Sequence, residues 1–174
     1  MACKIWGDGR LADEADAPND IWPMDFMHDQ LSDGRSFRLF NLLDDFNREC
    51  LGVEANFSLL AVRVIRALDQ IIEWRGKPKR LRCDNGPEFI SQELEKWTDK
   101  HKIQLEFIQT GKLQQNAYVE RYNRTVRYGW LSQYLFASTK EVQGYATDWL
   151  WFYNHERPNK ANGSLPSKHM PRAA

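Results

Sequence analysis

Three carboxylate residues stand out as groups that could do chemistry. Asp25 lies inside the apolar run IWPMDFM, Asp84 begins the segment DNGPEF, and Glu120 follows after 35 intervening residues. Carboxylate oxygens suit Mg²⁺, and one or two per ion suffice because this metal keeps several waters. Two ions about 3.5–4 Å apart can stabilise the attacking and leaving oxygens of a phosphoryl displacement. We therefore predict that these three residues are catalytic and bind two Mg²⁺ or Mn²⁺ ions.

Helical spacing gives Glu120 a set of polar neighbours. Residues three, four and seven positions away share its face of a helix. Their side chains suit phosphate oxygens, and the loop before the helix adds two more. On spacing alone, an ordinary solvated face with a Glu120–Arg124 ion pair is the better explanation. With all three acids considered, we predict DNA contacts at Lys112, Gln115, Asn116, Asn123, Arg124 and Arg127.

The hydrophobic pattern predicts an α/β fold. Residues 21–30 and 51–57 alternate as strands do, and the apolar run 35–46 completes an antiparallel meander. Strands at 79–84 and 103–108 then alternate with helices, which indicates parallel strands joined by right-handed crossovers. We predict a mixed five-stranded sheet with helices on both faces. The first predicted helix covers 61–74. The second follows Gly86, and its buried stripe holds Phe89, Ile90, Leu94 and Trp97. The third begins at about 114, and the fourth runs from 139 to Pro158.

Several residues mark the ends of these helices. Ser58 is the expected N-cap of the first helix, and Gly76 is its expected end. Ser138 and Glu141 have the spacing of a capping box. A glycine inside a helix costs about 1 kcal/mol relative to alanine, so the third helix should break or bend near Gly129.

Composition indicates one intracellular domain. The chain has 174 residues, 42% of them hydrophobic, which is enough for one well-filled core. Its 24 basic and 24 acidic residues cancel, but residues 1–20 hold five acids against two bases, so the remainder carries +3. Three separated cysteines favour a reducing cytosol over disulfides or zinc, and no segment suits a membrane span or signal peptide. We expect a poorly ordered leader at 1–19, a core at 20–158 and an extended tail at 159–174.

Motifs around the three acids form a further pattern. Asp25, the segment 82–89 and the segment 111–127 are followed by YNHERP at 153–158. Over residues 20–160 this combination resembles the D,D(35)E catalytic core of retroviral integrases and bacterial insertion-sequence transposases, closest to transposases encoded by two overlapping reading frames. The resemblance implies a ribonuclease-H-like fold, dependence on Mg²⁺ or Mn²⁺, DNA cleavage by an activated water, and strand transfer by a 3′-OH. Leu113 departs from the proline usual in that family, and Gly129 from a polar helix former.

The same resemblance implies partners. They are transposon ends and target DNA, with a homo-oligomer assembled on DNA in the bacterial cytoplasm, at the nucleoid. The sequence holds no helix-turn-helix or zinc module for recognising DNA ends. We therefore expect a separate DNA-binding domain that is absent from this chain.

Other assignments of function and site remain open. A ribonuclease-H-like nuclease would cut without joining, and an inactive core would serve DNA binding or oligomerisation. Asp44 and Asp45 are rival ligands, although a buried hydrogen-bonded role is the better explanation. The basic run at 75–82 is equally consistent with a DNA-tracking surface and a solvated edge. Aromatic residues with helical spacing favour core packing over base stacking, as at Tyr118, Tyr122 and Trp130.

Overall fold

A computed structural model describes residues 14–86, 91–108 and 116–169. Five strands form one sheet in the order β3-β2-β1-β4-β5. The antiparallel strands are β1 (Ile21–Gln30), β2 (Ser36–Leu43) and β3 (Cys50–Asn56), and β4 (Arg80–Cys83) and β5 (Gln104–Phe107) run parallel to β1. The helices are α1 (Ala61–Arg75), α2 (Gln92–His101), α3 (Ala117–Gly129) and α4 (Thr139–His155). The predicted mixed sheet is confirmed.

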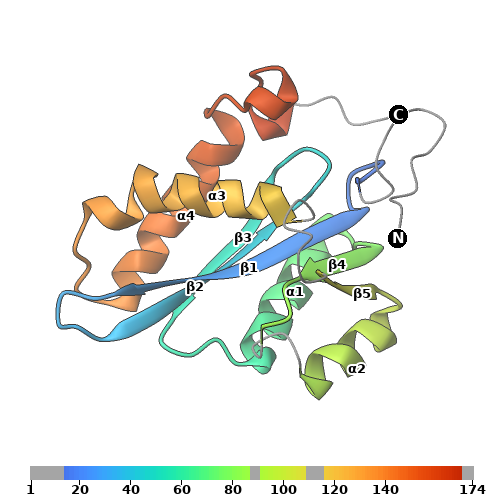
Figure 1. Ribbon diagram of the computed structural model, residues 1–174, viewed down its shortest axis with the longest axis horizontal. Helices are drawn as coiled ribbons and strands as arrows, with labels where there is room; N and C mark the ends of the chain where they lie inside the picture. The colour runs from blue at the N-terminus through green and yellow to red at the C-terminus, as the bar shows by residue number, and fades with distance from the viewer. Residues whose placement is uncertain (1–13, 87–90, 109–115, 170–174) are drawn as a thin grey trace.

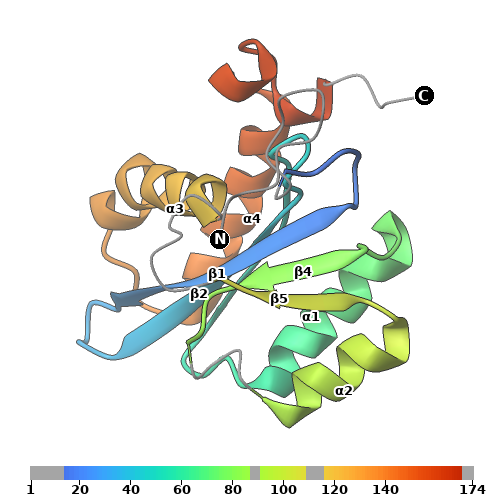
Figure 2. The same cartoon turned by 45° about the vertical axis from the view of Figure 1, so that its right-hand side comes forward.

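The helices cover both faces of the sheet (Figures 1 and 2). Because side chains alternate along a strand, β1 and β2 supply a core on each face. Trp22 and Phe40 pack with α1 and α2, whereas Met27 and Leu39 pack with α3 and α4. Within the described residues, no helix is long and apolar enough to cross a bilayer.

The beginning of α1 differs from the prediction. The helix starts at Ala61 with Leu60 as its N-cap, and no side chain caps it. Ser58 was therefore wrong as the cap, because Leu59 is drawn into the core, where it is 4% exposed. The predicted end is confirmed, since Gly76 adopts a φ of 86° and donates its N–H to the carbonyl of Ile72.

The C-terminal end of α3 lies at Gly129, as predicted. A Cβ atom at this position would lie 2.7 Å from the ring of Trp149 on α4. Gly129 therefore leaves room for the Trp149 ring against α3. Trp130, which follows, is 2% exposed in the core.

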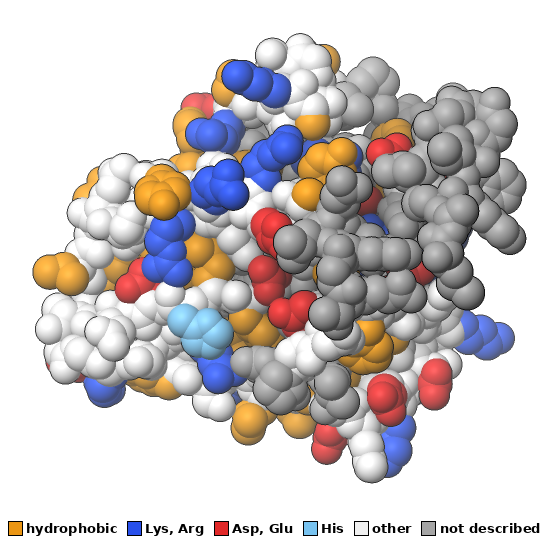
Figure 3. Space-filling model, in the orientation of Figure 1, with side chains coloured by type: hydrophobic (Ala, Val, Ile, Leu, Met, Phe, Trp, Pro, Cys, Tyr) orange, Lys and Arg blue, Asp and Glu red, His pale blue; other side chains and the backbone are white. Residues whose placement is uncertain are grey.

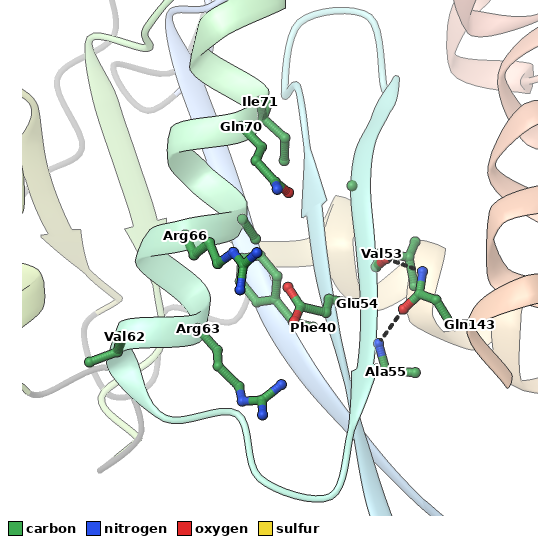
Figure 4. Close-up of a pocket in the computed structure, with 12 residues that line it drawn as sticks. Phe40, Val53, Glu54, Ala55, Val62, Arg63, Arg66, Gln70, Ile71 and Gln143 are labelled. Carbon is green, nitrogen blue, oxygen red and sulfur yellow. Dashed lines mark hydrogen bonds between the residues drawn. The ribbon is translucent and has the colours of Figure 1, made fainter. Parts of the chain in front are cut away.

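Helix α4 covers the outer edge of β3. Gln143 accepts from the N–H of Ala55 at 2.8 Å and donates to the carbonyl of Val53 at 3.0 Å (Figure 4). Asn154 makes the same two-way contact with the backbone of Cys50, at 2.8 Å in each direction. These two amides satisfy edge groups that would otherwise be free to pair with another strand.

The segments flanking the core are more ordered than expected. The backbone N–H of Asn19 donates to Asp44, so the fold begins before residue 20. The prediction of an extended tail is wrong for 159–169, which holds 3-10 turns at Lys160–Asn162 and Ser167–His169. Asn162 donates to the carbonyl of Asn47, and this long-range contact folds the segment back. Residues 1–13 and 170–174 lie outside the described residues.

Candidate functional site

Asp25 lies on the face of β1 that packs against α3. Its Oδ1 accepts from the N–H of Phe26 at 2.8 Å, and its Oδ2 accepts from Nδ2 of Asn123 at 2.7 Å. Asn123 also accepts from Asn41, which is fully buried and paired with Asp25 across the β1–β2 ladder. These contacts fix the orientation of the Asp25 carboxyl. Asn41 was missed from the sequence, although a polar residue within the apolar run of β2 was a usable signal.

Strand register positions Asp84 next to Asp25. In the parallel β1–β4 pair, Ile21 lies opposite Arg80 and Pro23 opposite Arg82. Two residues further along, the same register brings Asp25 and Asp84 level. Cys83 is buried in the core under α1 and α2, so alternation directs Asp84 to the face that Asp25 occupies.

Glu120 lies in the first turn of α3, three residues before Asn123. The two residues share a side of the helix, which brings the exposed Glu120 towards the Asp25 carboxyl. Acidic side chains gather near the centre of this face in Figure 3. The N-terminus of α3 favours a negative charge at this position.

The pKa of Asp25 reports on all three acids. Burial disfavours its charged form and raises the pKa to about 6. The N–H of Phe26 opposes that rise, whereas the negative charges of Asp84 and Glu120 add to it, and the bond from Asn123 opposes it again. The charges of Asp84 and Glu120 therefore both act on Asp25. A cation relieves such repulsion.

The donor set fits a hard divalent cation, because it consists of carboxylate oxygens without sulfur or imidazole. Among the described residues, however, no three His, Cys, Asp or Glu side chains form a group compact enough to hold one metal ion. The sheet determines the positions of Asp25 and Asp84, whereas helix α3 determines the position of Glu120.

The residues predicted to contact DNA differ in exposure and in the bonds that they already make within the protein. Arg124 is exposed and lines a groove of about 470 Å³ between β1 and α3, together with His28 and Tyr128. Arg127 lines the same groove but is held by Asp29 at 2.6 Å. Asn116 is 5% exposed, and Asn123 is engaged with Asp25. Lys112 and Gln115 lie outside the described residues, as does Leu113.

The rival acids have structural roles. Asp44 is fully buried and pairs with Arg75 at 3.1 Å, and Asp45 pairs with Arg48 at 3.0 Å. The hydrogen-bonded interpretation of this acidic pair is confirmed. Core packing is likewise confirmed for Tyr122 and Trp130, which are 1% and 2% exposed.

The basic run at 75–82 is largely engaged within the fold. Arg75 bonds Asp44 and Glu49, while Arg80 and Arg82 both reach Glu106 across the β4–β5 pair. Their charges are therefore largely neutralised by neighbouring acids. This pairing favours a structural role over a DNA-tracking surface.

A further groove lies away from the three acids. It has a volume of about 630 Å³ between α1 and β3, with Arg63 and Arg66 facing Glu54 (Figure 4). None of Asp25, Asp84 and Glu120 lines it. The groove therefore has no part in the carboxylate site.

Comparisons with known proteins agree with this architecture. Sequence models of the integrase core domain match residues 15–112 and 101–166. The chain is 37% identical over 149 residues to an uncharacterized 39.2 kDa protein of insertion element IS476 from Xanthomonas euvesicatoria, covering 86% of this chain and 43% of that protein. It is 37% identical over 153 residues to an uncharacterized 31.7 kDa protein of IS407 from Burkholderia multivorans, covering 87% and 55%. The chain thus spans about half the length of these relatives.

Solved structures share the fold. A chain of the simian T-cell lymphotropic virus intasome, in complex with PP2A regulatory subunit B56 gamma, matches with a TM-score of 0.75 and 23% identity, over 92% of this chain and 58% of that one. The HTLV-2 integrase catalytic core domain in complex with magnesium matches with a TM-score of 0.70 and 23% identity, over 88% and 96%. The predicted ribonuclease-H-like fold and the resemblance to integrases and transposases are confirmed. The family models match more than half of the chain. The chain therefore belongs to the integrase core domain family.

Proposed function

We propose that this domain is the catalytic core of an insertion-element transposase, which cleaves DNA and joins a 3′-OH to a phosphodiester. Membership of the integrase core family supports this reaction class. Relatives in two bacterial insertion elements support a role in transposition. The observation that carries the proposal is the contact between Asp25 and Asn123, because it joins the strand paired with β4, which ends just before Asp84, to the part of α3 that holds Glu120.

In this proposal Asp25, Asp84 and Glu120 hold two Mg²⁺ or Mn²⁺ ions. When bound, the ions supply Lewis-acid stabilisation and lower the pKa of an attacking water or 3′-OH. The magnesium complex of the HTLV-2 core lends support to a divalent metal. Asn123 and the N–H of Phe26 hold the Asp25 carboxyl in one orientation. Phosphoryl transfer needs positioning and charge neutralisation more than a protein nucleophile, so this set of residues suffices.

Residues on α3 would position the DNA strand. Arg124 is exposed beside Asn123 and can donate to a phosphate oxygen. Arg127 first has to exchange its bond to Asp29 for one to phosphate. Lys112, Gln115 and Asn116 complete the proposed DNA contacts near the beginning of α3.

The partners of the whole protein belong to the same proposal. They are transposon ends and target DNA, bound by a homo-oligomer at the bacterial nucleoid in the cytoplasm. Recognition of the ends would come from a DNA-binding domain outside this core. The masses of the two insertion-element relatives, 39.2 and 31.7 kDa against 20.5 kDa for this chain, support such a division.

The test is a joining reaction on a branched DNA that mimics a transposition product. The domain is incubated with this DNA and Mn²⁺ beside Glu120→Gln, which keeps the shape of the side chain and removes its charge. Glu93→Gln is the matched control, because Glu93 is also an exposed glutamate in the first turn of a helix. We expect the parent and the control to resolve and rejoin the strands. Glu120→Gln should be more than about 100-fold slower, since losing even an outer partner of a metal ligand costs 10–100-fold.

The other outcomes separate the alternatives. Hydrolysis without joining by the parent would identify a nuclease of the same fold. Equal inactivity of the parent and Glu120→Gln, with DNA bound, would identify a non-catalytic core. Equal activity of Glu120→Gln and the parent would remove Glu120 from the catalytic set.

A further inference from the structure

A second polar site lies on the other side of α3 from Glu120. It is a pocket of about 350 Å³ where α3, the β2–β3 loop and the segment after α4 meet. Tyr118, Tyr122 and Tyr153 contribute aromatic rings to its lining. The basic residues that line it are Arg48, Arg121, Arg157 and Lys160.

These cations are poorly neutralised. Within the described ranges, no carboxylate forms an ion pair with Arg121, Arg157 or Lys160. Arg48 pairs with Asp45, but its buried Nε has no hydrogen-bond partner. A buried donor without an acceptor costs about 1–3 kcal/mol, so the pocket is suited to an anion.

Arg48 is held in a strained backbone conformation. Its φ is 62°, a left-handed value that non-glycine residues rarely adopt. Its guanidinium lies over the ring of Tyr118, 3.1 Å from the centroid. Such strain persists only where the surroundings fix it, and it is concentrated at functional positions.

The three arginines of the pocket line it together with Tyr153. Burial raises the pKa of its hydroxyl above the ordinary range, and a negative charge on Cys50 would add to that rise. The positive charges of Arg157, Arg48 and Arg121 act in the opposite direction. Three cations from three separate segments therefore act on one hydroxyl group.

The motif YNHERP at 153–158 has no role in the carboxylate site described above. Its residues form part of the lining of this pocket. Asn154 ties the end of α4 to the backbone of Cys50. Tyr153 packs edge-on against Tyr122, with ring centroids 4.9 Å apart. Arg157, four residues after Tyr153, lines the pocket. The motif thus anchors the C-terminal end of α4 and presents a cation beside α3.

We propose that this pocket binds a backbone phosphate of the DNA strand whose reacting phosphodiester lies at the carboxylate site. The choice of DNA as the ligand rests on the proposed function. Arginine forks suit phosphate oxygens. Lys and Arg side chains lie next to the acidic group on the face shown in Figure 3.

The experiment measures binding of a labelled DNA duplex by the full chain in EDTA, so that the carboxylate site contributes no metal-dependent binding. The variant is Arg121→Gln/Arg157→Gln. The matched control is Arg63→Gln/Arg66→Gln, which removes two exposed cations from α1 on the opposite face of the sheet. Binding is followed between about 50 and 200 mM salt. Lys160→Gln, a single exposed change, keeps the test valid if the double variant does not fold.

We expect the double variant to bind about tenfold more weakly than the parent, with a salt dependence reduced by about 0.9 for the lost phosphate contact. The control should match the parent, and Lys160→Gln should fall between them. Arg157→Lys should keep the salt dependence, because the charge remains. Equal losses in the variant and the control would overturn the proposal, as would absence of binding by the parent at about 50 mM salt.

A further comparison separates DNA from a small anion. If inorganic phosphate raises the thermal midpoint of the parent while Arg121→Gln/Arg157→Gln binds DNA normally, the pocket is a small-anion site and the proposal fails. The joining reaction tests a different claim. If the parent binds DNA through the pocket but does not join strands, only the transferase function is contradicted. If the parent joins strands but its DNA binding does not depend on the pocket, only the pocket proposal is contradicted.

Discussion

Asp25 is subject to opposing effects on the charge of its carboxyl group. Burial and two like charges disfavour its carboxylate, whereas the N–H of Phe26 and the amide of Asn123 favour it. The result is a pKa of about 6, so at neutral pH most of this group is charged. A divalent ion would reverse the sign of the local interaction, because it attracts all three carboxylates.

Metal-free protein should show this strain as a pH dependence of its stability. Because the folded pKa of about 6 exceeds the ordinary value of 3.8, the native state binds more protons than the unfolded state between these values. The stabilising contribution is present below about pH 4 and is lost as the pH rises through about 6. From pH 4 to 7, Asp25→Asn should therefore gain about 2–3 kcal/mol of unfolding free energy relative to the parent. Urea unfolding in EDTA measures the difference, and a pH-independent difference would contradict the assignment.

At the scale of elements, α3 separates the two proposed sites and α4 fixes its position. Glu120 and Arg124 project from one side of α3 and Arg121 from the other. Helix α4 packs against α3 where Gly129 meets Trp149, and it bonds the edge of β3 through Gln143 and Asn154. The position of Glu120 therefore depends on contacts distant from it in the sequence.

Gly129 gives a direct test of that packing. Gly129→Ala places a Cβ about 2.7 Å from the Trp149 ring, so the ring or the helix has to move. Overpacking of this kind costs about 1–3 kcal/mol, which exceeds the gain of up to about 1 kcal/mol in helix propensity. We expect a net loss of about 1 kcal/mol in urea unfolding. The control is Gly144→Ala on α4, where a Cβ meets nothing within 4 Å and should stabilise the protein; stabilisation by both changes would contradict the close approach.

Local sequence signals predicted the elements well, because alternating apolar residues mark strands and a glycine marks the end of a helix. The strand at 21–30 and the break at Gly129 are examples. It failed where distant residues decide the structure. Leu59 is drawn into the core and delays the start of α1, and Asn162 reaches Asn47 to fold the tail back. Such contacts have no local signature.

At the scale of the whole molecule, topology assembles the carboxylate site. Parallel pairing of β1 with β4 brings Asp25 level with Asp84, although 58 residues lie between them. The motifs predicted the identity of these acids, and the strand register accounts for their proximity. The basic pocket could not be predicted, because its residues come from segments that only the tertiary fold brings together.

The central claim is that Asp25, Asp84 and Glu120 bind a divalent metal. The most direct measurement is paramagnetic broadening of backbone amide NMR signals during titration with Mn²⁺. Our account predicts the strongest broadening at Asp25, Phe26 and Asp84, and its loss in Asp84→Asn but not in the exposed control Asp99→Asn. Broadening centred on Asp44 and Glu49, or broadening unchanged by Asp84→Asn, would contradict it.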